Sequence, residues 1–208
     1  MEAFLDPVVK AGGSVLLVPA IPEAVDANAI ARTCDGLLLT GSWTNMAPAS
    51  YGGSSCTEGT NPDRDSVSLT LAERMIARGH PVLGICLGMQ ELAVLYGSTL
   101  RCLQKNPTHM AQCGASGAGV FEHKHEVDLL SSRMTSMAGT SRVAVVSAHY
   151  QAIDRISNSL TVEAEADDGA IEAIRADEEG RVCGVQWHPE RLVSRLDHAL
   201  FRNLIDLA

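Results

Sequence analysis

The sequence predicts an α/β fold in which a largely parallel sheet is covered by helices on both faces. Short apolar runs with strand character recur along the chain, and segments with helical periodicity lie between several of them. A length of 208 residues allows one substantial core. We therefore expect a single domain over residues 1–208.

The expected strands are the apolar runs bounded by loop-forming residues. They lie at 14–19, 36–40, 81–86, 126–130, 143–147, 161–165 and 182–187. A helix at 3–11 comes before the first of these strands, so the chain enters a helix almost at its first residue. The predicted order begins helix, strand.

Two further helices are indicated by the spacing of apolar residues. In 65–78, Val67, Leu71 and Met75 repeat at i+4, and Gly79 provides a stop. Near the C-terminus, leucines repeat every fourth residue from 192 to 204 and form one apolar stripe. We expect that stripe to pack on the sheet.

Composition excludes several classes of protein. The formal net charge is −9 without a run of Lys or Arg, so nucleic acid is not an expected partner. The longest apolar runs, 14–21 and 82–89, are too short to span a bilayer, so no membrane partner is expected. The N-terminus lacks the pattern of a secretory signal, and the six cysteines lack the spacing of a zinc site or disulfide scaffold. A cytoplasmic protein with mostly reduced cysteines is the expectation.

Two stretches, 42–63 and 105–119, have loop composition, being rich in Gly, Ser, Pro, Asn and Thr. Long loops inside a compact domain are usually functional or mobile, and neither stretch resembles a domain linker.

The most informative segment is 81–97, PVLGICLGMQELAVLYG, which places Cys86 between Gly84 and Gly88. A strand pattern gives way there to a helical one, and small residues two before and two after a nucleophile suit a tight strand-to-helix elbow. A helix N-terminus stabilises the thiolate form of a cysteine such as Cys86 relative to its thiol form. The N–H of Leu87 is then a natural donor to an oxyanion.

A candidate base stands in the segment 184–190, GVQWHPE, where an apolar strand ends at His188. Residues i and i+2 of an extended chain face the same way, so Glu190 can orient one imidazole nitrogen and leave the other for Cys86. That is the arrangement of nucleophile, base and orienting acid. Taken alone, however, a cysteine in an apolar run is more often a buried small residue. The HPE segment alone is more often an ordinary strand end.

The two motifs together resemble the class I glutamine amidotransferases. The resemblance implies a doubly wound, flavodoxin-like fold and a triad of Cys86, His188 and Glu190 that forms a gamma-glutamyl thioester. It also implies that the Gly41 N–H is a second oxyanion donor and that Gln90 binds substrate. No cofactor is implied.

The chain is most similar to the branch of that family that hydrolyses gamma-glutamyl-gamma-aminobutyrate and related gamma-glutamyl amines. The residues that carry this likeness include Asp35-Gly36, Thr40-Gly41-Ser42, Asn45, Tyr51-Gly52, Arg64-Asp65, SAHYQAI at 147–153, Asp168-Gly169, 171–173 and Trp187. The resemblance implies a small-molecule gamma-glutamyl substrate and release of glutamate and a free amine, and leaves open a homo-oligomer. A glutaminase subunit that donates ammonia to a separate synthase, or a catalytically silent assembly subunit, are the alternatives.

Other side chains have two readings each. His149 and Gln151 follow the strand at 143–147, where the family contacts the amino-acid end of the glutamyl group; they could instead cap a loop. Trp43 and Tyr51 lie in the loop after Gly41 and either wall the pocket or pack, and the loop at 42–53 predicts that Trp43 walls the leaving amine. His123 and His125 have a spacing that zinc could use. The sequence shows no third ligand near them, so no metal is expected, and His125 is expected to cap or pair beside the sheet.

One departure from the family concerns the start of the sheet. Its members begin with a strand and a loop before the helix that ends in AGG, whereas this chain opens almost directly in that helix. The first strand is therefore expected to be missing, which would leave N–H and C=O groups of neighbouring strands unpaired.

Overall fold

The structure is a computed structural model that describes residues 2–53, 59–103, 108–109 and 123–208. Its strands are β1 (Leu37–Leu39), β2 (Val82–Ile85), β3 (Thr99–Cys102), β4 (Lys124–Leu129), β5 (Arg142–Val146), β6 (Gln151–Arg155), β7 (Thr161–Ala166), β8 (Ile171–Arg175) and β9 (Val182–Val185). Its α-helices are α1 (Glu2–Lys10), α2 (Ala27–Thr33), α3 (Pro62–Ala77), α4 (Leu87–Leu95), α5 (Ser132–Ala138) and α6 (Arg195–Asp206). Short 3-10 helices are η1 (Pro22–Ala24), η2 (Pro48–Ser50) and η4 (Pro189–Arg191).

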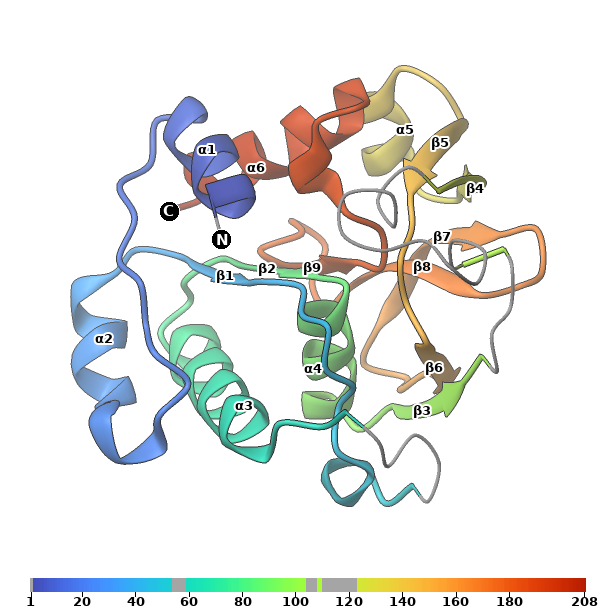
Figure 1. Cartoon of the computed structure of the whole chain (residues 1–208). Helices are drawn as coiled ribbons and strands as arrows, with labels where there is room; N and C mark the ends of the chain where they lie inside the picture. The colour runs from blue at the N-terminus through green and yellow to red at the C-terminus, as the bar shows by residue number, and fades with distance from the viewer. Residues whose placement is uncertain (1, 54–58, 104–107, 110–122) are drawn as a thin grey trace.

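The main sheet is mixed rather than largely parallel. Seven described strands form it in the order β1-β2-β9-β8-β7-β4-β5, and β3 pairs with β6 in a separate ribbon (Figure 1). Only β1, β2 and β9 run parallel; the pairs from β9 to β5 are antiparallel. The tight turn at Gly169, with φ +78°, shows why: β7 and β8 are joined by a hairpin instead of a helical crossover. The α/β class is confirmed, but its parallel part is smaller than predicted.

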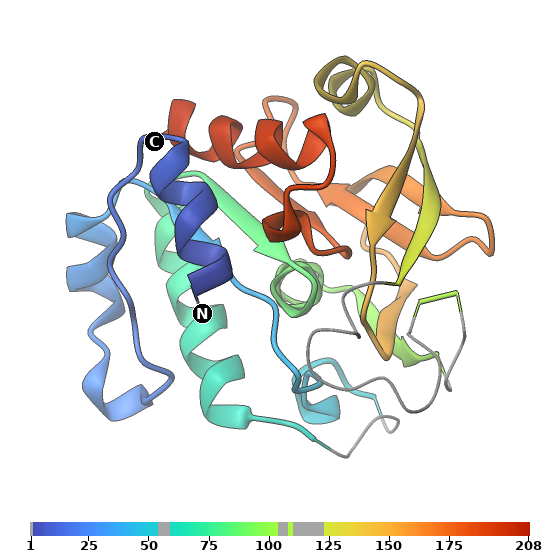
Figure 2. The same cartoon turned by 45° about the horizontal axis from the view of Figure 1, so that its top comes forward.

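Helices cover both faces of the parallel part of the sheet, as predicted. Figure 2 shows α1 and α6 on one side of it and α3 on the other. Alternate residues of β2 point to opposite faces: Leu83 and Ile85 join the apolar cluster that includes Leu200 of α6, whereas Val82 joins the cluster of Met75 in α3. The strand ends that carry functional groups are therefore held by buried apolar contacts on two sides.

The prediction of a strand at 14–19 is wrong. This segment has no strand structure, and Val15, Leu16 and Leu17 are 42%, 59% and 56% exposed. An apolar run becomes a strand only when its N–H and C=O groups find a neighbouring strand, and no described strand pairs with this one. Helix α1 begins at Glu2, and no strand comes before β1 in the described chain, so β1 is an edge of the sheet.

The other predicted elements are present with shifted ends. Helix α3 begins three residues earlier than predicted, because Asn61 caps it and Pro62 occupies its first position. Helix α6 begins at Arg195, where Ser194 and Asp197 form a capping box. Strands β3, β6 and β8 were not predicted.

Three remaining expectations concern loops, membrane and cysteines. Of the predicted loop at 105–119, all but residues 108–109 lies outside the described residues. No helix in the described ranges is long and apolar enough to cross a membrane. Cys34, Cys86 and Cys183 are free, as predicted for most cysteines, but Cys102 takes part in a disulfide bond.

Candidate active site

Cys86 stands on the predicted elbow between β2 and α4. Its backbone has φ 52° and ψ −107°, a conformation that is uncommon for a residue with a side chain. Gly84 and Gly88 make the turn possible: a Cβ on Gly84 would lie 2.5 Å from the Gly88 carbonyl oxygen, and one on Gly88 would lie 2.2 Å from that of Leu39. The strained backbone and the two close approaches confirm the geometric reason for the GxCxG motif.

The surroundings of Cys86 hold it at the start of a helix. Its N–H donates to the Val185 carbonyl at 2.8 Å, which ties the elbow to β9. Leu87 is the first residue of α4, so its N–H belongs to the first turn, which lacks intrahelical partners. The thiol is 3% exposed, and Sγ lies 4.0 Å from the Ala148 carbonyl oxygen. The predicted nucleophile is thus largely enclosed and lies at a helix N-terminus.

His188 and Glu190 form the expected acid-base pair. The main-chain N–H of His188 donates to the Val146 carbonyl oxygen at 2.8 Å, and the ring nitrogen Nδ1 lies 2.7 Å from Glu190 Oε1. Burial alone would lower the pKa of His188, but Cys86 and then Glu190 outweigh it and raise that pKa to about 10. Because Nδ1 is occupied by Glu190, Nε2 is the nitrogen left for the thiol.

The two halves of the site meet because their strands are neighbours. Ile85 pairs with Val185 in parallel register, so β2 and β9 deliver Cys86 and His188 to the same edge of the sheet. Gly41 completes this edge: a Cβ on it would lie 3.1 Å from His188 Cε1 and 3.4 Å from Cys86 Cβ. The structure therefore brings the predicted triad and the predicted oxyanion glycine together.

Arg64 makes a contact beside Gly41 that the sequence analysis did not predict, although it named Arg64 as part of the resemblance. Its guanidinium donates to the Thr40 carbonyl oxygen and lies 3.4 Å from the buried Glu91 carboxylate. The C=O and N–H of a trans peptide point in opposite directions, so a fixed Thr40 carbonyl also fixes the Gly41 N–H. Burial raises the pKa of Glu91 to about 8, against the opposing charge of Arg64.

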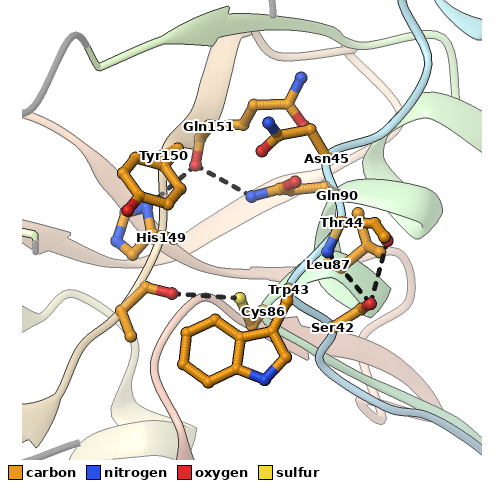
Figure 3. Close-up of a pocket in the computed structure, with 11 residues that line it drawn as sticks. Ser42, Trp43, Thr44, Asn45, Cys86, Leu87, Gln90, His149, Tyr150 and Gln151 are labelled. Carbon is orange, nitrogen blue, oxygen red and sulfur yellow. Dashed lines mark hydrogen bonds between the residues drawn. The ribbon is translucent and has the colours of Figure 1, made fainter. Parts of the chain in front are cut away.

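A pocket opens beside Cys86, and the predicted substrate-binding side chains line it (Figure 3). Its wall is formed by Ser42, Trp43, Thr44, Asn45, Cys86, Leu87, Gln90, Ala148, His149, Tyr150 and Gln151. Trp43 is 65% exposed and Tyr150 46%, so the rim of the pocket carries two exposed aromatic rings. The structure assembles Trp43, Gln90, His149 and Gln151 around one opening.

Three of these residues each have at least one polar atom that is already bonded within the protein. Gln90 Nε2 donates to the Gln151 carbonyl at 2.9 Å and to Gln186 Oε1 at 3.0 Å. Gln151 accepts from the Met46 N–H at 2.8 Å, and His149 Nδ1 lies 2.9 Å from the Gln151 carbonyl oxygen. These contacts shape the pocket wall. The substrate-binding roles of the three side chains stay predictions.

The two candidate zinc histidines separate in the structure. His123 Nε2 lies 2.8 Å from the Thr108 carbonyl oxygen, away from the site. His125 instead joins His109, His149 and Glu172 in a buried group whose ligand atoms could hold a metal ion. The sequence analysis did not name His109, and it named Glu172 only within 171–173 as part of the resemblance, so it did not predict that either residue lies beside His125 and His149.

Comparisons with known proteins show which proteins the chain is similar to. The family model for Peptidase C26 matches residues 1–190. The chain is 35% identical to a Mycobacterium tuberculosis protein named "Putative glutamine amidotransferase Rv2859c", covering 99% of this chain and 66% of that one, which is just under two thirds of its length. It is 31% identical to the gamma-glutamyl-gamma-aminobutyrate hydrolase PuuD of Escherichia coli K12, covering 99% of this chain and 83% of that one.

The fold also resembles a solved structure. A crystal structure named as a "putative gmp synthase subunit a protein" from Thermoplasma acidophilum superposes with a TM-score of 0.70 at 20% identity. The match covers 99% of this chain and 86% of that one. At this identity the likeness concerns the fold alone.

Proposed function

The chain belongs to the Peptidase C26 family, and on that premise we propose that it hydrolyses gamma-glutamyl amides through a thioester on Cys86. The observation that carries the proposal is the meeting of Cys86, His188 and Gly41 at one edge of the sheet, with Glu190 bonded to the base. A nucleophile, an oriented base and an oxyanion glycine are the parts that acyl transfer requires.

The reaction starts from the ion pair in which His188 holds the proton of the Cys86 thiol. The thiolate attacks the gamma-carbonyl carbon, and the oxyanion that forms accepts hydrogen bonds from the N–H groups of Gly41 and Leu87. His188 then gives its proton to the departing nitrogen as the C–N bond breaks, so the amine leaves and a thioester remains.

Hydrolysis of the thioester returns the enzyme to its starting state. His188 removes a proton from water, the hydroxide adds to the acyl carbon, and the C–S bond breaks to release glutamate. Glu190 holds the imidazole through Nδ1 and stabilises the imidazolium in both halves of the reaction. The high pKa of His188 supports this role, because the ion pair with the Cys86 thiolate lowers the energy of the reactive state.

We further propose that the substrate is a gamma-glutamyl amine, with gamma-glutamyl-gamma-aminobutyrate as the first candidate. Trp43 and Tyr150 stand at the rim of the Cys86 pocket and offer apolar surface to a leaving group larger than ammonia. The similarity to the E. coli hydrolase supports the same choice. A pocket that contacts the amine discriminates by transition-state binding, so kcat/KM should exceed that for glutamine.

The alternative is a glutaminase subunit that donates ammonia to a synthase. It is favoured by the similarity to the M. tuberculosis protein with a glutamine amidotransferase name. The two proposals differ in their preferred substrate and in their need for a second protein.

The experiment is a screen of gamma-glutamyl amines and glutamine for glutamate release by the purified chain, with Cys86→Ser as the background control. We expect a gamma-glutamyl amine to give the higher kcat/KM without any partner. Trp43→Ala should reduce this preference and keep glutamine hydrolysis. A parent that prefers glutamine and turns over only with a second protein would make the glutaminase proposal correct instead.

A further inference from the structure

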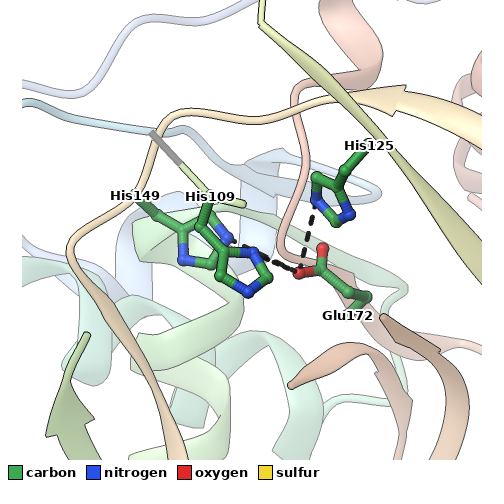
Figure 4. A group of neighbouring side chains, drawn as sticks. All are labelled: His109, His125, His149 and Glu172. Atoms are coloured by element: carbon green, nitrogen blue, oxygen red, sulfur yellow. Dashed lines mark ion pairs between the residues drawn. The ribbon is translucent and has the colours of Figure 1, made fainter. Parts of the chain in front are cut away.

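A second cluster of titratable side chains lies behind the wall of the Cys86 pocket. Glu172 of β8, His125 of β4, His149 after β5 and His109 converge there, and one potential ligand atom from each lies within 4.8 Å of all the others (Figure 4). The side chains of His109 and Glu172 are fully buried, and those of His149 and His125 are 1% and 7% exposed. The proposed reaction uses none of these four as acid, base or nucleophile.

Hydrogen bonds on the outside of the cluster fix the protonation of each imidazole. Nδ1 lies 3.2 Å from a main-chain carbonyl oxygen in His125 and 2.9 Å from another in His149. In His109 it is Nε2 that lies 2.9 Å from Asp168 Oδ2. A carbonyl or carboxylate oxygen only accepts, so each of these nitrogens carries the proton. In the neutral imidazole the other nitrogen then has a free lone pair.

Those lone pairs all point inward at one carboxylate oxygen. Glu172 Oε1 lies 3.4 Å from His109 Nδ1, 3.7 Å from His125 Nε2 and 3.5 Å from His149 Nε2. None of these inward atoms makes a hydrogen bond. Four electron-rich atoms that face one another in a buried site repel and lack solvation, unless a cation lies between them.

We propose that His109, His125, His149 and Glu172 bind one divalent transition-metal ion of the zinc type. Zinc bonds of 2.0–2.2 Å in a tetrahedron place neighbouring ligand atoms about 3.3–3.6 Å apart, close to the separations from Glu172 Oε1. Imidazole nitrogen suits zinc and its neighbours, whereas calcium and magnesium prefer oxygen ligands. The donated Nδ1–H and Nε2–H bonds are the outer contacts that orient metal-binding histidines.

The charges of the four ligands suit a divalent ion. Three neutral imidazoles and one carboxylate leave one positive charge on a divalent ion, which Asp168 beside His109 partly balances.

The metal site has a structural role rather than a catalytic one. Four protein ligands fill a tetrahedral shell and leave no position for water or substrate. The ion would join β4 and β8 to the segment that follows β5, where Ala148 faces the Cys86 thiol and Tyr150 lines the pocket. Metal binding thus stabilises one wall of the active site.

This proposal replaces the sequence-based expectation that the chain holds no metal. That expectation rested on the pair His123 and His125, which had no third ligand nearby in sequence. The fold supplies the missing ligands to His125 from three other segments, and His123 takes no part.

The test is the metal content of the full chain, produced without a polyhistidine tag because a tag binds metals itself. After incubation with zinc and desalting, we expect about one zinc per chain. Cobalt in place of zinc should give the visible absorption of a four-coordinate ion. Removal of zinc with a chelator should lower the Tm of the parent, since an ion that binds only the folded state stabilises it.

Variants locate the ion. Glu172→Gln and His125→Ala should each lose the zinc, and chelator should leave their Tm unchanged. The exposed His198 provides a matched control, because His198→Ala removes an imidazole that does not belong to the cluster. The Cys86→Ser variant tests whether the thiol is a ligand. Both should keep the zinc. Folding of every variant is checked by circular dichroism.

The outcomes separate the proposal from its rivals and from the proposed hydrolysis. A folded parent that takes up neither zinc nor cobalt would overturn the site and indicate a buried cluster that shares protons. Zinc retained by folded Glu172→Gln and His125→Ala would also overturn it. These readouts are metal content and Tm, so they stand whether or not gamma-glutamyl amides are cleaved.

Discussion

Replacement of Gly88 by alanine tests the elbow more sharply than replacement of the nucleophile itself. The added Cβ would lie 2.2 Å from the Leu39 carbonyl oxygen and 2.6 Å from Leu39 Cβ. The first contact is with backbone, so no side-chain rotation relieves it. Strand β1 and helix α4 must separate by about 1 Å before the methyl group fits at an ordinary contact distance.

That displacement affects stability and activity by different amounts. Forcing a methyl group into a close-packed interior costs about 1–3 kcal/mol, which lowers the Tm of a domain of this size by roughly 2–12 °C. The chain should still fold. Because Cys86 is the residue before α4, a shift of about 1 Å changes its position relative to His188, and a misplacement of that size costs about a hundredfold in rate.

The assay compares kcat/KM and Tm of Gly88→Ala with those of Gly36→Ala. A Cβ on Gly36 would meet side chains of Pro81, Leu204 and Ala208 at 3.4–3.6 Å, which is ordinary contact, so this control should keep activity close to that of the parent. If Gly88→Ala folds and keeps kcat/KM within about threefold of the parent, the close approach does not position the nucleophile and the reasoning fails.

Four further predictions concern the groups around the nucleophile. Glu190→Gln and His188→Ala should both lower kcat, and the loss in His188→Ala should be at least about tenfold larger, because the carboxylate orients the base without receiving the proton. Equal losses would contradict those roles. His188 should keep its proton well above pH 6.5, so the alkaline limb of the pH profile of kcat/KM should lie near its pKa of about 10, and a limb near 6.5 would refute this. Iodoacetamide at mildly acidic pH should label Cys86 before Cys183, because burial raises the pKa of the Cys183 thiol to about 11. Peptide mapping that shows the reverse order would contradict this prediction. Arg64→Met should lower kcat by roughly 10- to 100-fold with KM little changed, since it frees the peptide that carries an oxyanion donor, and an unchanged kcat would remove its positioning role.

Local signals predicted the parts of the fold that depend on local chemistry. Gly88 is required by the close approach of α4 to β1, and Gly84 by the close approach of β2 to the first turn of α4. Both requirements are visible in the spacing of Gly84, Cys86 and Gly88. Helix α3 carries its own periodicity and stop signal, so only its start was misplaced. Such features can be predicted without knowing which distant segments lie beside them.

The errors arose where a segment depends on a distant partner. The run at 14–19 has the composition of a strand but no described strand beside it. Strand β8 was missed because Glu172 interrupts its apolar pattern, and that glutamate is buried only because three histidines from other segments surround it. Composition alone carries no information about such neighbours.

The candidate active site was predicted from a resemblance as much as from chemistry. Cys86 and His188 lie far apart in sequence, and their meeting depends on the parallel register of β2 with β9, which neither motif encodes. The contact of Arg64 with the Thr40 carbonyl was not predicted for a related reason, since the long loop lies between the two residues in the sequence.

The thioester on Cys86 is the central claim, and it is tested most directly by acid quench of the parent during its first turnover with a gamma-glutamyl amine. Peptide mapping by mass spectrometry should find one gamma-glutamyl group on Cys86, formed at the rate at which the amine is released. The Cys86→Ser variant provides the unmodified control. Glutamate release that continues without any adduct on Cys86, or an adduct on another residue, would contradict the account.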